Sequence, residues 1–137
     1  MGSSLVKSAL PTEATSRTAR GVVALARDDG SVICERCVVA DRMLPRMKGL
    51  LGRRSLRAGE GLLIRPAPSI HTFFMRFAID AVFLGRDGDV LQVADNVKPW
   101  HARSCRGART VLELAAGEAK RRGISRGDRL AVAEAEA

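Results

Sequence analysis

The chain has 137 residues, of which 46% are hydrophobic and 28% charged, with a formal net charge of +8 and a pI near 10.6. These values are those of one ordinary folded domain, and they exclude a disordered chain or a membrane-embedded one. No apolar run approaches the roughly 18 to 20 residues of a membrane helix, and the N-terminal segment lacks the apolar core of a secretory signal, so we expect a monomeric cytoplasmic protein with no membrane partner.

Residues 1–20 show no sustained periodicity, and we expect them to form a disordered N-terminal tail ahead of a single β domain over residues 21–134. Two β-branched, apolar runs at residues 21–26 and 31–40 flank a turn-forming segment and predict a hairpin. Residues 41–51 have apolar side chains at three- and four-residue spacings, which predicts a short helix capped by Asp41.

The rest of the chain continues as short apolar runs separated by turns rich in glycine and aspartate. Strands are expected at residues 61–64, 70–75, 79–84, 90–94, 110–116 and 130–133, with one helical turn at 118–122. Seven or eight short strands with two short helices predict a mainly β fold. A small β-sandwich of the jelly-roll kind and a partly closed barrel both fit this pattern.

The excess positive charge is mostly arginine and falls in two clusters, over residues 42–57 and 103–129. Clustered cations attract phosphates with little demand on sequence. Aromatic residues make up only 4% of the chain, however, and single-strand binders interleave such cations with aromatic rings. We therefore expect a solvated basic face, with an anionic small molecule or a partner protein favoured over nucleic acid.

Several motifs resemble one family when they are taken in order along the chain. They lie at residues 46–53, 61–64, 79–84 with 87–88, 111–117, 123–124 and 127–128. This succession, over residues 22–132, resembles domain of unknown function 192 (DUF192). The resemblance implies a compact, mostly β fold similar to a jelly-roll sandwich, usually a stand-alone bacterial or archaeal domain, with no established activity. Many relatives carry Trp-Met and then Lys-Asn before the central aspartate, whereas residues 71–77 here read HTFFMRF, so no role of that Asn carries over.

Two carboxylates lie within apolar runs. Asp80 follows Ile79, and Glu113 lies between Leu112 and Leu114. A buried carboxylate costs several kcal/mol unless it is paired, so we expect a cation nearby, and the family resemblance implies Arg46. Either these groups form a structural network with ion pairs or backbone amides, or they serve as acid and base in catalysis.

The three cysteines allow a weak metal hypothesis. Cys34 and Cys37 form a CxxC motif, which Cys105 with His101 and His71 could complete as a four-ligand zinc site. On a regular strand, however, these two side chains point to opposite faces unless a bulge or turn intervenes. We therefore expect inert or buried thiols, with no bound metal and no cofactor.

A ligand pocket is expected where His71, Thr72 and Met75 meet the loop of Trp100 and His101, because loops on a rigid sheet often carry binding sites. The predicted ligand-binding residues are Arg46, His71, Thr72, Asp80, Trp100 and Glu113. Two classes of function stay open. One is a non-catalytic binding or accessory module for an anionic small ligand or a partner protein. The other is an enzyme that uses Asp80, Glu113 or a Cys/His metal site.

Overall fold

The computed structural model describes residues 21–40, 56–73 and 75–133. The elements of this part of the chain are β1 (Val22–Arg27), β2 (Val32–Ala40), β3 (Glu60–Ile64), β4 (Ser69–His71), β5 (Ile79–Leu84), β6 (Val90–Val97), β7 (Ala102–Ser104), β8 (Thr110–Ala115), α3 (Glu118–Arg121) and β9 (Leu130–Ala133). The expected mainly β composition is confirmed. The helix expected over residues 41–51, the tail at 1–20 and Arg46 lie outside the described residues.

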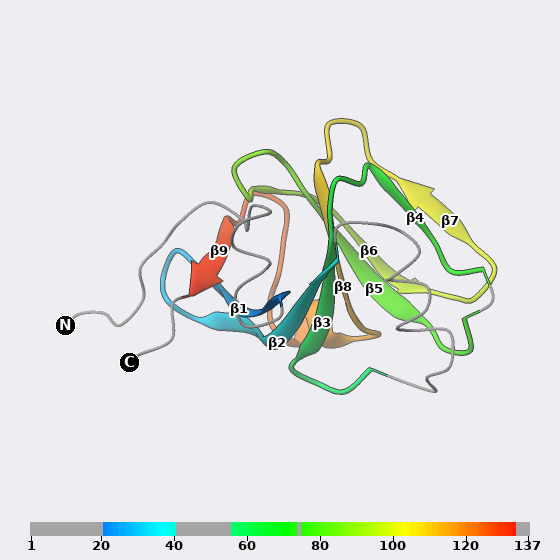
Figure 1. Ribbon diagram of the computed structural model, residues 1–137, viewed down its shortest axis with the longest axis horizontal. Coiled ribbons are helices and arrows are strands. Elements are labelled where there is room, and N and C mark those ends of the chain that lie inside the picture. The colour runs from blue at the N-terminus through cyan, green and yellow to red at the C-terminus, as the bar shows by residue number, and fades with distance from the viewer. Residues whose placement is uncertain (1–20, 41–55, 74, 134–137) are drawn as a thin grey trace.

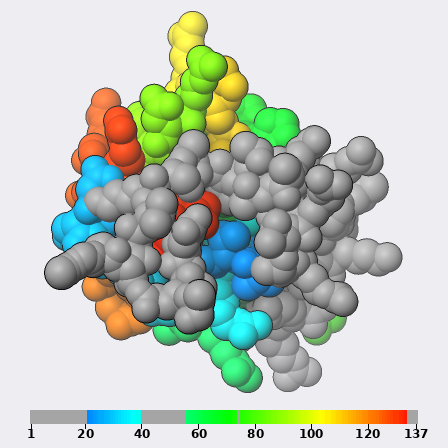
Figure 2. Space-filling model, turned by 60° about the vertical axis from the view of Figure 1, so that its left-hand side comes forward, coloured from blue at the N-terminus to red at the C-terminus, as the bar shows by residue number. Residues whose placement is uncertain are grey.

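Seven strands form one mixed sheet in the order β6-β5-β8-β3-β2-β1-β9, and β4 pairs with β7 in a separate two-stranded sheet (Figure 1). In the large sheet β2 and β3 are parallel, and the other neighbouring strands are antiparallel. A parallel pair needs a crossover connection, and residues 41–59 connect these two strands. The N-terminal hairpin β1–β2 is confirmed. Figure 2 shows the face on which β9, in red, lies beside β1, in blue.

The sheet is not closed into a barrel, and neither the partly closed barrel nor the jelly-roll sandwich is confirmed. The two edge strands β6 and β9 approach each other at one end, where an isolated bridge joins Asp89 to Arg129. The Leu130 N–H also donates to the Gly88 carbonyl oxygen at 2.9 Å. Strand number and spacing alone could not distinguish these arrangements, because the same short alternating strands can build an open sheet, a sandwich or a barrel.

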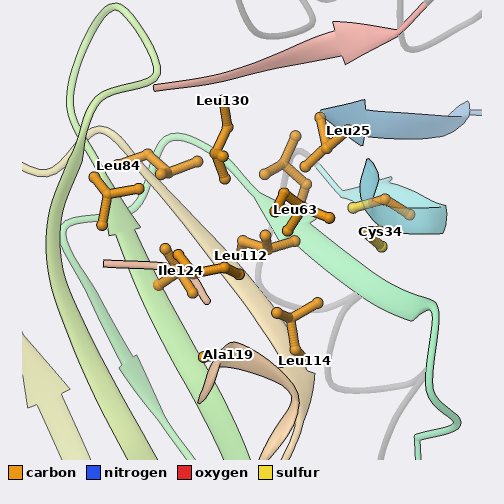
Figure 3. Packing of buried hydrophobic residues seen from close by; sticks show 13 residues of the cluster. Leu25, Cys34, Leu63, Leu84, Leu112, Leu114, Ala119, Ile124 and Leu130 are labelled. Carbon is orange, nitrogen blue, oxygen red and sulfur yellow. The ribbon is translucent and has the colours of Figure 1, made fainter. Parts of the chain in front are cut away.

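Apolar side chains cover both faces of the central strands. On β5, Val82 and Leu84 join one core cluster, whereas Ala81 and Phe83 join the other. This alternation follows from the two-residue repeat of a strand. In the first cluster, side chains from several strands converge on Ala119 and Ile124, which lie between β8 and β9 in the chain (Figure 3).

The second core cluster lies between the sheet and the connections β3–β5 (residues 65–78) and β6–β8 (residues 98–109), which carry β4 and β7. We call these two connections the β4–β7 lobe. Ile70 and Met75 from the lobe pack with Phe83 and Val111 of the sheet. Burying each such side chain contributes about 1.5–3 kcal/mol, so the lobe is held by the same interior that holds the sheet.

Two predicted strands end three or more residues away from the expected position, and one strand was missed. The strand expected over residues 70–75 ends at His71, because the next backbone groups bond to the turn before β7. β6 continues to Val97 instead of ending at residue 94. β7 was missed because its residues Ala102, Arg103 and Ser104 are all exposed and lack a β-branched apolar pattern.

Among the described residues, no helix has the length and apolar character that crossing a bilayer requires.

Candidate functional site

Thr72 connects the end of β4 to the turn that precedes β7. Its side chain is completely buried. The Thr72 backbone N–H donates to the His101 carbonyl oxygen at 2.8 Å, and the Trp100 N–H donates to the Thr72 carbonyl oxygen at 3.0 Å. The Thr72 hydroxyl donates to the Lys98 carbonyl oxygen at 2.6 Å and accepts the His101 N–H at 2.9 Å. One buried residue therefore fixes the whole turn.

Three aromatic rings lie next to one another on the surface of the lobe. The ring centroids of His71 and Phe73 are 4.8 Å apart, and those of Phe73 and Trp100 are 5.9 Å apart, both in stacked orientation. Phe73 is 39% exposed and Trp100 is 60% exposed. We call these three rings the aromatic stack. Because stacking buries only part of the surface of each ring, the stack leaves hydrophobic area in contact with water.

Trp100 adopts a backbone conformation that is unfavourable for its residue type. Its φ is 68°, in the left-handed region. A residue with a side chain costs about 1–2 kcal/mol there. The hydrogen bonds that Thr72 makes with Trp100 and His101, together with the fixed φ of Pro99, hold the turn in place. Strained residues that persist under such constraints cluster at functional sites.

A hollow of about 320 Å³ lies beside the stack. It is lined by Ser69, Ile70, His71, Phe73, Ala102, Arg103 and Ser104. Arg103 lies opposite Ile70 in the β4–β7 pairing, and its guanidinium donates to the Ala102 carbonyl oxygen at 2.8 Å. The rings of His71 and Phe73 and the guanidinium of Arg103 therefore line the same hollow.

Two further residues expected at this pocket have different positions. Met75 is 5% exposed and belongs to the core beneath the lobe. His101 is exposed, and its Nδ1 donates within its own turn to the carbonyl oxygens of Lys98 and Pro99, at 3.1 and 2.9 Å. Phe73 was not among the predicted site residues. Its signal was the two-residue spacing from His71, which puts the two rings on one side of an extended segment.

Asp80 is a completely buried carboxylate that accepts hydrogen bonds from the backbone. Its Oδ1 accepts the N–H of Asn96 at 2.8 Å, and its Oδ2 accepts the N–H groups of Gly117 and Ala119, both at 2.9 Å. The carboxylate thereby links β5 to the bend in β6 and to the start of α3. These bonds match the structural alternative, in which a buried carboxylate binds backbone amides at strand ends.

Glu113 is also completely buried, but it lies on the opposite face of the sheet from Asp80. In the β5–β8 pairing Asp80 is opposite Leu114, which belongs to the core cluster around α3, whereas Glu113 is opposite Ala81, which belongs to the cluster beneath the lobe. The two acids therefore cannot act on one substrate as a pair. Arg46, the cation that the resemblance implies, lies outside the described residues.

Cys34 and Cys37 are both completely buried. The strand pairing explains how: Val23 is opposite Cys37 and Leu25 is opposite Cys34, so two steps on β1 match three on β2. This β-bulge interrupts the alternation of side chains along β2, so both thiols point into the same core cluster. Burial and a hydrogen bond with Cys34 raise the pKa of Cys37 well above its usual value. Within the described residues, no group of three or more His, Cys, Asp or Glu side chains is arranged to hold a metal ion.

A cluster of charges that the sequence analysis did not single out connects α3 to β2. Arg122 bonds the carboxylates of Glu35 at 3.0 Å and Glu118 at 3.3 Å. Hydrogen bonds from Arg121 hold the pKa of Glu118 below its usual value, and hydrogen bonds from Arg122 do the same for Glu35. This cluster fastens α3 to the sheet.

The family comparison agrees with this fold and its motifs. The model of a family described as "Uncharacterized ACR, COG1430", DUF192, matches residues 24–132. The chain belongs to the DUF192 family. No curated protein matches it.

Two solved structures resemble this DUF192 chain. One is from Sinorhizobium meliloti 1021 and is described as a candidate transcription regulator; it has 28% identity and a TM-score of 0.70, over 81% of this chain and 92% of the other. The second, of unknown function, is from Novosphingobium aromaticivorans DSM 12444, with 25% identity and a TM-score of 0.69 over 91% of each chain. Both likenesses cover most of this chain.

Residues 71–77 supply His71, Thr72 and Phe73 to the site.

Proposed function

We propose that this protein is a binding module, and that its binding surface is the aromatic stack together with the adjoining hollow. The proposal rests mainly on Trp100. Its side chain is 60% exposed, its backbone is in the left-handed region, and the buried Thr72 holds its turn in place. An exposed indole held in a strained turn is costly for the folded state alone. A role in ligand contact explains why it is placed there.

The chemistry of the hollow favours a ligand that combines a ring with an anionic group. A planar or sugar ring can pack on Trp100 or Phe73, because aromatic faces bind such rings with little loss of conformational entropy. The guanidinium of Arg103 can form paired hydrogen bonds with a phosphate or carboxylate. Phosphorylated sugars and nucleotides have both parts.

Binding is favoured over catalysis by the state of the two carboxylates. Asp80 accepts three backbone hydrogen bonds, and both Asp80 and Glu113 are 0% exposed. A general acid or base must come within hydrogen-bond reach of its substrate. Neither group has that access in this conformation.

A thermal-shift screen tests the proposal. The protein is heated with a panel of sugar phosphates, nucleotides and small carboxylic acids, since a compound that binds only the folded form raises its melting temperature. We expect at least one compound to raise the melting temperature of the wild type and of Arg129→Gln, a control at the far end of the sheet near β9 (Figure 1). Trp100→Ala and Arg103→Gln should lose the shift. A shift that survives both substitutions would place binding elsewhere, and a panel without any shift would refute the proposal.

A further inference from the structure

The β4–β7 lobe is strongly basic. Residues 65–78 and 98–109 contain no Asp or Glu and six basic residues: Arg65, Arg76, Lys98, Arg103, Arg106 and Arg109. The lobe thus has a net charge of +6. Residues 42–57 also contain six basic residues and no Asp or Glu, but they contain no aromatic residue.

The aromatic residues are concentrated in the same lobe. The chain has one Trp, four Phe and two His, and the lobe contains the Trp, three of the Phe and both His. The low average aromatic content of the chain does not reveal this local concentration of rings. A basic surface interleaved with exposed rings is the combination by which proteins bind single-stranded nucleic acid, with bases stacked on rings and phosphates beside cations.

We infer that the β4–β7 lobe binds a single-stranded nucleic acid segment, with a base on the Trp100–Phe73 end of the stack and the backbone phosphates beside Lys98 and Arg103. The inference rests on the proposed function and names its ligand. Lys98 and Arg103 are exposed on either side of Trp100 in the chain, and Arg103 shares the hollow with Phe73. A base packed on the stack would therefore place its phosphate near a cation.

The geometry favours a single strand over a duplex. The stack offers ring faces, and only an unpaired base can turn its own face to them, because base faces inside a duplex are covered by their neighbours. Within the described residues of the lobe no carboxylate repels the phosphate backbone. The contacts require no particular base, so we expect little sequence preference.

The test is fluorescence anisotropy with a labelled oligothymidylate of about ten nucleotides, a length within the range of roughly 4–16 that small single-strand-binding folds cover. Binding is measured at several salt concentrations. We expect the logarithm of the association constant to fall with the logarithm of salt concentration, by a slope of about 0.7 for each phosphate contacted. The corresponding duplex should bind more weakly.

The variants separate the contribution of the rings from that of charge. Trp100→Ala should weaken binding roughly 5- to 150-fold, the effect of one lost base stack. Arg103→Gln should weaken binding and reduce the salt slope by about 0.7. Arg129→Gln also removes one positive charge, but at a position outside the lobe. It should leave the affinity and the salt slope nearly unchanged. Far-UV circular dichroism of each variant verifies that it is folded, and Phe73→Ala provides a second test of the stack.

The outcomes distinguish this inference from the proposed function. If thymidine monophosphate binds in a Trp100-dependent way and the oligonucleotide binds no more tightly, the lobe recognises a small ligand, and the nucleic-acid inference is overturned while the proposed function stands. Oligonucleotide binding that Trp100→Ala and Phe73→Ala leave unchanged also overturns the inference. If neither the oligonucleotide nor the compound panel binds, both are refuted.

Discussion

The backbone N–H of Trp100 donates a hydrogen bond of 3.0 Å to the carbonyl oxygen of Thr72. The two residues are far apart in sequence, and this bond joins the end of β4 to the turn before β7. The exposed ring of Trp100 is positioned by a residue that is itself completely buried. The proposed binding surface is therefore held in place by a buried residue, and changes at Thr72 should alter this surface without removing a ligand contact.

Thr72→Val tests this positioning. Valine has nearly the same shape but no hydroxyl, so the Lys98 carbonyl and the His101 N–H lose their partner. We expect a loss of about 1–3 kcal/mol in the free energy of unfolding. The amide protons of Trp100 and His101 should exchange faster with solvent, as measured by NMR. Thr72→Ser keeps the hydroxyl and should retain slow exchange; equally slow exchange in Thr72→Val would show that the hydroxyl does not hold the turn.

Trp100→Gly and Trp100→Ala together measure the strain at this position. Both remove the indole, but glycine tolerates a φ of 68° whereas alanine does not. We expect the glycine variant to be more stable than the alanine variant by about 1 kcal/mol in urea denaturation. Both variants should lose ligand binding. An alanine variant as stable as the glycine variant would argue against backbone strain at Trp100.

Asp80→Asn should destabilise the fold strongly. An amide group cannot accept hydrogen bonds through its nitrogen, so at least one of the N–H groups of Asn96, Gly117 and Ala119 would face another donor. We expect a loss of about 3 kcal/mol in urea denaturation, because hydrogen bonds to a buried charge are among the stronger ones. Asp95→Asn, on the exposed part of β6, is the matched control and should change stability little. A loss below about 1 kcal/mol at Asp80 would contradict its structural role.

The Arg122 cluster predicts a pH dependence. The pKa values of Glu35 and Glu118 lie below their usual value of 4.5, so their contribution to stability is complete above that pH and is lost as the pH falls through the lowered values. Arg122→Gln should cost about 1 kcal/mol at neutral pH. Its difference from the wild type should shrink below about pH 4.5. Arg126→Gln, an exposed control, should show a difference that does not change with pH.

The cysteines should differ in reactivity. Cys34 and Cys37 are completely buried, and the pKa of Cys37 is raised by burial, whereas Cys105 is partly exposed. A thiol reagent at mildly alkaline pH should therefore label Cys105 first and reach the other two only after denaturant is added, because the thiolate is the reactive form. Mass spectrometry of labelled peptides identifies each site. Rapid labelling of Cys34 in native protein would contradict the packing of β2.

Much of the fold followed from local pattern. The hairpin of β1 and β2 was visible in its turn residues, and β5 and β8 in their continuous apolar runs. The strand order of the open sheet was not, because the parallel pairing of β2 with β3 depends on a long connection and leaves no local signal. The three exposed residues of β7 likewise gave none.

The site was only partly predictable. His71, Thr72 and Trp100 were expected together and do lie together. The sheet separates Asp80 from Glu113, and this separation depends on the strand register, which cannot be read from the sequence. The β-bulge that brings Cys34 and Cys37 to one side was also outside local reasoning. Average composition hid the aromatic stack, since it counts rings without saying where they gather.

The most direct measurement uses Trp100 itself, because the chain has a single tryptophan and no tyrosine. Its emission is followed while nucleotides, sugar phosphates and oligothymidylate are added to the wild type and to Phe73→Ala. A binding surface at the stack predicts saturable quenching or a spectral shift by at least one of these probes, weakened in Phe73→Ala. Emission that stays constant while the same probe raises the melting temperature would place the binding site away from the stack and contradict the proposal.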